Sequence, residues 1–91
     1  HRDMSVEAWA EAFNNAFEDL NRHLEAGRET ALDPYAAQAP AEFFAVSCEA
    51  FFETPGVLHR AYPKVYDQLK RFFRQDPLAA ETAETAGVQH K

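Results

Sequence analysis

The sequence predicts an all-α fold with three main helices. Apolar residues recur every three or four positions in two segments, near residues 6–26 and 63–74, and this spacing places them on one face of a helix. A third segment, residues 40–53, is rich in phenylalanine and begins with a proline, which suits the first turn of a helix. No stretch of the sequence alternates apolar and polar residues as a half-buried strand does.

The first helix is predicted over residues 6–26. Its apolar stripe consists of Val6, Trp9, Phe13, Phe17, Leu20 and Leu24. Ser5 is suited to cap the N-terminus, and Gly27 is suited to the left-handed conformation that often follows a helix. The next segment, "GRETALDPY", reads as a loop, because Pro34 disfavours helical dihedral angles at Asp33.

The second helix, predicted over residues 40–53 and ended by "TPG", has an unusual polar pattern. Its polar stripe is narrow and contains Glu42, Val46, Glu49 and Glu53, whereas apolar side chains cover most of the remaining surface. Two interpretations remain open. The carboxylates face water, since glutamate is seldom buried without a partner. Alternatively, one of them lies in a cleft and binds a cation or a basic group, with Glu42 as the candidate.

The rest of the chain contains one more predicted helix. The segment "VLHRAYP" is expected to form a short helical turn or a loop. A third helix follows over residues 63–74, and its apolar face consists of Val65, Tyr66, Leu69, Phe72 and Phe73. We therefore expect one helical domain over residues 1–78 and a polar tail over residues 79–91.

Composition excludes several classes of protein. A chain of 91 residues forms at most one domain, and 46% hydrophobic residues are too many for a disordered chain. A net charge of -6 argues against a nucleic-acid partner. Cys48 is the only cysteine, so no internal disulfide can form and a cytoplasmic location is expected. No apolar run reaches the roughly 20 residues that span a bilayer, so no membrane association is expected.

Three motifs carry a family resemblance. They are Tyr-x-x-x-x-Pro-x-Glu-x-Phe-Ala-Val from Tyr35, Ser-x-Glu-x-Phe-Phe from Ser47, and Arg-Gln-Asp-Pro from Arg74. The chain from about Trp9 to Leu78 resembles the C-terminal part of the Mlc titration factor A family. These proteins are bacterial zinc metallopeptidases, also called DgsA anti-repressors. The sequence departs from the family pattern at Ala36, where glycine is common, and at a few similar positions.

The resemblance implies a gluzincin-type zinc site. In such a site, two histidines and a catalytic glutamate come from an HExxH helix, and a later helix supplies a glutamate as the third ligand. Carried over, the third ligand falls on Glu42, and the tyrosine that stabilises the oxyanion falls on Tyr35. A ligand set of two imidazoles and one carboxylate leaves an open catalytic position on zinc. Glu49, further along the same stripe, is a candidate to support the ligand.

One departure from the family is decisive, because this sequence contains no HExxH. Neither His23 nor His59 has a second histidine four residues away, and His1 and His90 lie at the ends of the chain. Glu42 alone binds zinc far too weakly, so no metal is expected on this chain by itself. We therefore interpret the chain as a C-terminal portion of a zinc metallopeptidase, inactive without the missing N-terminal part of the peptidase.

Two other functions remain open. The resemblance implies that the family also binds the glucose repressor Mlc, so the chain could be a non-catalytic protein-binding module. The phenylalanines of residues 40–53 exceed what two neighbouring helices can cover, and self-association through this Phe-rich surface is expected. A simple structural helical bundle with no site is the third alternative.

Overall fold

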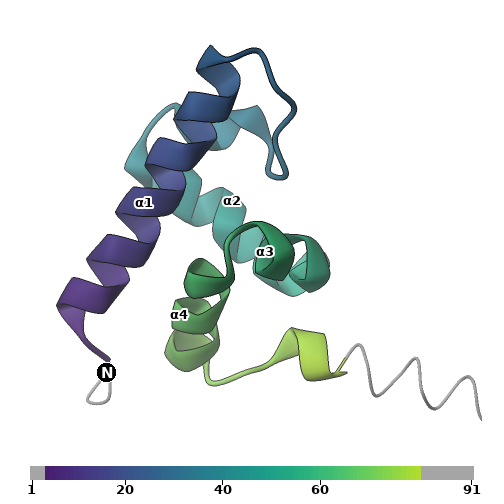
Figure 1. Cartoon of the computed structure of the whole chain (residues 1–91). Helices are drawn as coiled ribbons and strands as arrows, with labels where there is room; N and C mark the ends of the chain where they lie inside the picture. Colours follow the sequence, from purple (N-terminus) through teal and green to yellow (C-terminus); the bar gives the residue numbers. More distant parts are fainter. Residues whose placement is uncertain (1–3, 81–91) are drawn as a thin grey trace, which may run out of the picture.

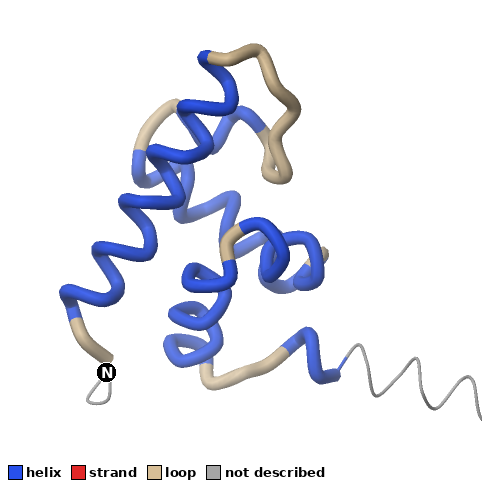
Figure 2. Tube along the Cα trace, viewed as in Figure 1, coloured by secondary structure: helices blue, strands red, loops and turns tan. Residues whose placement is uncertain are grey.

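The computed structural model describes residues 4–80 of the chain. Within this range all regular structure is helical, which confirms the predicted all-α class (Figure 2). The elements in chain order are α1 (Val6–Glu25), the 3-10 helix η1 (Pro34–Ala37), α2 (Pro40–Glu53), α3 (Pro55–Ala61) and α4 (Pro63–Phe73). No helix within residues 4–80 has both the length and the hydropathy that a membrane-spanning helix needs.

The ends of α1 follow the predicted capping residues. The Ser5 hydroxyl accepts a hydrogen bond from the Ala8 N–H at 3.1 Å, which satisfies one of the unpaired donors of the first turn. At the other end Gly27 adopts a φ of +71°, and its N–H donates to the Leu24 carbonyl at 3.0 Å. Glycine takes this left-handed conformation without the strain of a Cβ atom, so the helix ends within one residue of the predicted position.

Prolines open the three later α-helices. Pro40, Pro55 and Pro63 each occupy the first turn, where the missing N–H removes no intrahelical bond. The start at Pro55 resolves the segment that the sequence left as a turn or a loop, since it forms a short helix separated from α2 by Thr54 alone. Helix α4 ends at Phe73, and Arg74 follows with a left-handed φ of 55°.

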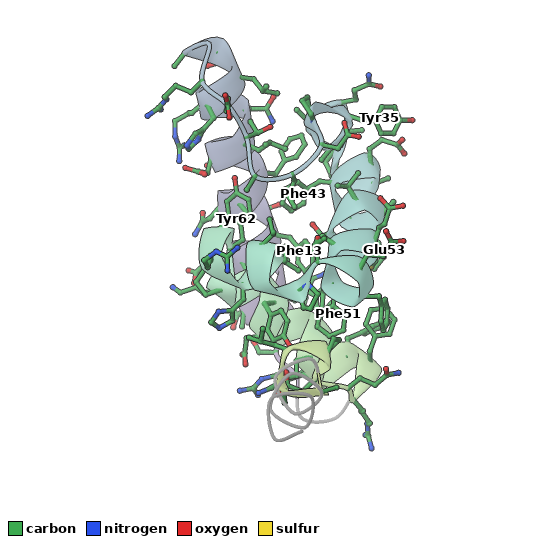
Figure 3. All side chains as sticks on the ribbon, turned by 90° about the vertical axis from the view of Figure 1, so that its right-hand side faces the viewer. Phe13, Tyr35, Phe43, Phe51, Glu53 and Tyr62 are labelled. Carbon is green, nitrogen blue, oxygen red and sulfur yellow. The ribbon has the colours of Figure 1, made fainter. Side chains whose placement is uncertain are left out.

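The core lies where α1 crosses α2 and packs against α4, while α3 packs on α2 and α4 (Figure 1). Element η1 lies against the start of α2 and against α1. The largest fully buried side chains are Phe43, Phe51, Leu20, Leu58, Leu69 and Val65. Phe13, Phe43 and Phe51 lie between the helices in Figure 3, and the Phe13 and Phe43 rings meet edge to face at 6.2 Å.

Two tyrosine hydroxyls tie distant parts of the chain together. Tyr62, between α3 and α4, donates to the Asp19 carboxylate on α1 at 2.9 Å. Tyr66, on α4, donates to the Asp76 carboxylate and accepts from the Leu78 N–H at 3.0 Å. These bonds fix α1 against the later helices and hold the residues that follow α4.

The predicted division into a domain and a tail stays a prediction. Residues 77–80 form one further helical turn, so helical structure continues two residues beyond the predicted boundary at residue 78. Residues 81–91 of the predicted polar tail lie outside the described residues, as does His90 within them. His1 also lies outside the described range.

Candidate functional site

Tyr35 and Glu42, the two residues predicted to act together, come from adjacent elements. Tyr35 lies in η1, and Glu42 lies in the first turn of α2, against which η1 packs. The Tyr35 side chain is 50% exposed, and Glu42 is partly buried. Figure 3 shows Tyr35 beside the start of α2, turned away from the buried phenylalanines. The packing of η1 on α2 therefore places both residues at or near the surface.

The electrostatics of the site link the two side chains directly. The Glu42 carboxylate raises the pKa of the Tyr35 hydroxyl, first through a side-chain hydrogen bond and then through its negative charge, with a smaller contribution from desolvation. The ordinary tyrosine pKa of 10.0 already keeps this hydroxyl protonated in the neutral range, and the raised pKa moves its ionisation further from that range. The arrangement places a carboxyl group beside a phenolic O–H donor.

The backbone around Tyr35 is organised by Asp33. Its carboxylate oxygen Oδ1 accepts a hydrogen bond from the Tyr35 N–H at 2.9 Å, and its carbonyl oxygen accepts from the Ala36 N–H at 2.9 Å. Ala36 is fully buried, so the turn packs against the core. This role of Asp33 was not predicted from the sequence, although Asp two residues before a turn N–H is a known signal for such a bond.

Glu49 lies in a different place from the Tyr35–Glu42 pair. It lines a shallow hollow of about 230 Å³ between α2 and the loop before η1, together with Glu53, Asp33 and mainly apolar neighbours. Neither Glu42 nor Tyr35 lines this hollow. Figure 3 places Glu53 on the same side of α2 as Tyr35. The predicted support of Glu42 by Glu49 stays a prediction.

The described residues contain no complete set of metal-binding side chains. No group of three His, Cys, Asp or Glu side chains within residues 4–80 is close enough to hold a metal ion. His23 is partly buried, and its Nδ1 lies 2.9 Å from the Asp19 carbonyl oxygen, whereas His59 is exposed and packs edge to face on Tyr66. Burial raises the pKa of the Cys48 thiol, which disfavours the thiolate form that binds metals.

A second surface feature is a row of aromatic side chains with the neighbouring Val6, here called the aromatic face. Phe44, Phe52, Phe72 and Val6 are exposed, and the partly buried rings of Trp9 and Phe73 complete the row. Trp9 joins its members across α1, α2 and α4, with ring centroids 6.0 Å from Phe44 and 5.5 Å from Phe72. A hollow of about 210 Å³ opens beside Trp9 and Phe72. The prediction that the phenylalanines of α2 outnumber what the neighbouring helices cover agrees with Phe52, which is 46% exposed.

Comparisons with known proteins identify relatives of this chain. The profile of the family described as glucose-regulated metallo-peptidase M90 matches residues 1–74. Mlc titration factor A of Edwardsiella ictaluri is 44% identical over 75 residues, which cover 80% of this chain. The protein of the same name from Pectobacterium atrosepticum is 40% identical over 80 residues, or 86% of this chain. In both cases the match covers 29% of the relative's length. None of the solved structures compared gives a significant match.

Proposed function

This chain belongs to the glucose-regulated metallo-peptidase family M90, and from that premise we propose that it contributes Glu42 as a zinc ligand and Tyr35 as an oxyanion donor to a peptidase site. The packing of η1, which contains Tyr35, on α2, whose first turn contains Glu42, is the observation that carries the proposal. A carboxylate in the first turn of a helix is held on a rigid element, and a zinc ion in a peptidase takes such a carboxylate with imidazole ligands.

The remaining donors come from outside residues 4–80, because that range contains no set of three metal-binding side chains. The chain covers 29% of the length of the relatives compared. We propose that the complete zinc site includes donors from a polypeptide of the relatives' length. A gluzincin-type site takes its two imidazoles from an HExxH helix, a motif absent from this sequence. By itself, the chain is therefore proposed to have no peptidase activity.

The chemistry assigned to this chain is positioning and charge stabilisation. Zinc, when bound, polarises the scissile carbonyl and activates water for hydrolysis of a peptide. Tyr35 donates its single O–H to the carbonyl oxygen as negative charge develops there, which requires the hydroxyl to turn from Glu42 toward the substrate. Glu42 contributes one negative oxygen ligand. Glu49 is proposed to steady α2 near this ligand from its position along the helix.

A chimera tests the proposal. The matching segment of the Edwardsiella ictaluri relative is replaced by this chain, and hydrolysis of a chromogenic aminopeptidase substrate is measured with zinc present. We expect Glu42→Gln to abolish turnover and Tyr35→Phe to lower kcat by roughly 10²–10³-fold, the usual loss for one oxyanion donor. The control is Glu53→Gln, which removes a carboxylate from the same helix and should leave kcat unchanged.

The same assay also tests whether the isolated chain is active without the rest of the chimera. The 91-residue chain alone should show no turnover with zinc. Turnover by the isolated chain that Glu42→Ala removes would contradict the proposed need for outside donors. Glu49→Gln in the chimera addresses the supporting role, which is wrong if both kcat and zinc content remain unchanged.

A second proposed function is protein binding through the aromatic face. Large exposed aromatic groups on a chain of net charge -6 support a protein partner rather than a nucleic acid. The relatives' name, Mlc titration factor A, makes Mlc the partner to test first. The rest of a peptidase domain and a second copy of this chain are the competing occupants. We also propose a cytoplasmic location, which the lone cysteine supports.

A further inference from the structure

The position of the Tyr35 ring depends on its backbone. The ring is half exposed, and η1 is a single short turn of four residues. Short 3-10 turns have poorer hydrogen-bond geometry than α-helices, so a turn of this kind needs outside support to keep one conformation. The support for Tyr35 comes from the residues immediately before it.

Asp33 supplies that support at two points. Its Oδ1 atom accepts a hydrogen bond from the Tyr35 N–H, which has no intrahelical partner at the start of a turn. Its carbonyl oxygen accepts a hydrogen bond from the Ala36 N–H. Pro34 fixes the intervening φ angle, so few other conformations of the turn remain. Together these bonds and the proline restrict the backbone at Tyr35 and hence the direction of its Cα–Cβ bond.

Buried neighbours hold Asp33 itself in place. Leu32, one residue earlier, is 4% exposed and packs in the core, and its carbonyl oxygen accepts a hydrogen bond from the Thr30 hydroxyl at 2.7 Å. Ala36 anchors the other end of the turn at 0% exposure. The Asp33 side chain is exposed, so its hydrogen bond to Tyr35 contributes local order rather than core stability.

We propose that Asp33 is the positioning residue for Tyr35: it caps η1 and so holds the Tyr35 side chain against Glu42. Its importance for catalysis rests on the proposed function, but the positioning itself needs no metal and no substrate. The competing role for the Asp33 carboxylate is electrostatic: it adds negative charge to the hollow that Glu49 and Glu53 also line. In that role the negative charge matters and the capping bond does not.

NMR spectroscopy of the metal-free 91-residue chain separates these roles. The readout is the nuclear Overhauser effect between the Tyr35 ring protons and the Glu42 side-chain protons. We expect it in the wild type and in Asp33→Asn, because asparagine caps as well as aspartate. We expect Asp33→Ala to lose it. Asp67→Ala, which removes an exposed carboxylate from α4, is the matched control and should retain it.

Three results overturn the proposal. The nuclear Overhauser effect between Tyr35 and Glu42 persists in Asp33→Ala, it is lost in Asp33→Asn as well, or it is absent from the wild type. If Asp33→Ala does not fold, hydrogen exchange decides the question. The Tyr35 amide of the wild type should then exchange at least roughly fivefold more slowly than an unbonded amide, as one hydrogen bond predicts. Because no metal is present, a failed zinc experiment leaves this result unaffected.

Discussion

The two adjacent phenylalanines Phe51 and Phe52 lie in very different surroundings. Phe51 is fully buried, and its ring contacts Tyr66 at 5.1 Å and Phe73 at 5.7 Å. Phe52 is 46% exposed on the aromatic face. Since the free energy of burial scales with the apolar area removed from water, only one of these rings contributes its full share to stability.

Phe51→Ala should therefore lower the free energy of unfolding by about 3–5 kcal/mol, because it leaves a cavity between α2 and α4. A domain of this size has about 5–15 kcal/mol in total, so the variant should unfold at much lower urea concentration. Phe52→Ala is the matched control and should lose less than half as much. The free energies of unfolding are measured by urea titration followed by circular dichroism. Equal losses in the two variants would contradict the burial of Phe51 and the exposure of Phe52 on α2.

The Tyr62–Asp19 bond gives the stability a distinctive dependence on alkaline pH. Burial raises the Tyr62 pKa well above its usual range, and the hydrogen bond to Asp19 and the negative charge of Asp19 raise it further. Because the folded-state pKa exceeds the unfolded value of 10.0, the stabilisation is fully present below pH 10.0 and is lost as pH rises through the folded pKa.

Tyr62→Phe should lower the free energy of unfolding by about 1 kcal/mol at pH 7, since it removes one partly buried hydrogen bond. The difference between the variant and the wild type should shrink as pH rises above 10.0. Urea unfolding at pH 7, 9 and 11 measures both effects. A difference that stays constant across this range would mean that the Tyr62 proton does not take part in the bond.

At the level of elements, two glycines show how local backbone geometry sets the ends of helices. Gly27 has a φ of +71°, and an added Cβ there would meet no atom within 4 Å. Any penalty at Gly27 is therefore conformational. Gly56, in the first turn of α3, has no such restriction, and its nearest neighbour is the flexible end of the Arg60 side chain at 3.3 Å.

Gly27→Ala should destabilise the chain by about 1 kcal/mol, because an L-residue resists the left-handed conformation. Gly56→Ala should be neutral or stabilising by up to about 1 kcal/mol, since alanine is the better helix former. Thermal unfolding by circular dichroism compares the two single variants with the wild type. Destabilisation by Gly56→Ala that equals or exceeds that of Gly27→Ala would contradict the assigned backbone.

The sequence predicted the elements better than their contacts. Ser5, Gly27 and Pro40 are local signals, and the helix ends that they predicted are confirmed. The segment of α3 remained undecided because a helix of seven residues has too few turns for a periodic pattern. The bond between Tyr62 and Asp19 joins residues 43 positions apart, and no local pattern specifies such a partner. Glu42 was a candidate from the residue pattern, whereas Tyr35 was suggested only by the family resemblance, and the catalytic role of the pair stays a proposal.

On the scale of the whole molecule, the described fold is flat. The Cα trace extends 46 × 36 × 16 Å, so its shortest dimension leaves little depth for a core. Large aromatic side chains consequently remain at the surface as the aromatic face. Exposed apolar patches of this kind mark interfaces on most soluble proteins.

The isolated chain should therefore self-associate at micromolar concentration. Sedimentation equilibrium should give a mass above 10.3 kDa that rises with concentration. Phe52→Ser should weaken the association, because it replaces an exposed aromatic ring with a small polar group. Gln75→Ser, at an exposed polar position after α4, is the control and should associate like the wild type. A strictly monomeric wild type would contradict self-association through the aromatic face.

The measurement that bears most directly on the central claim is the zinc content of the chimera with the Edwardsiella ictaluri relative. After dialysis against metal-free buffer, elemental analysis should find about one zinc ion per molecule in the unmodified chimera and in its Glu53→Gln variant. Glu42→Gln should retain almost none, because it removes the anionic ligand. An unchanged zinc content in Glu42→Gln, with the protein still folded, would show that α2 does not provide the ligand.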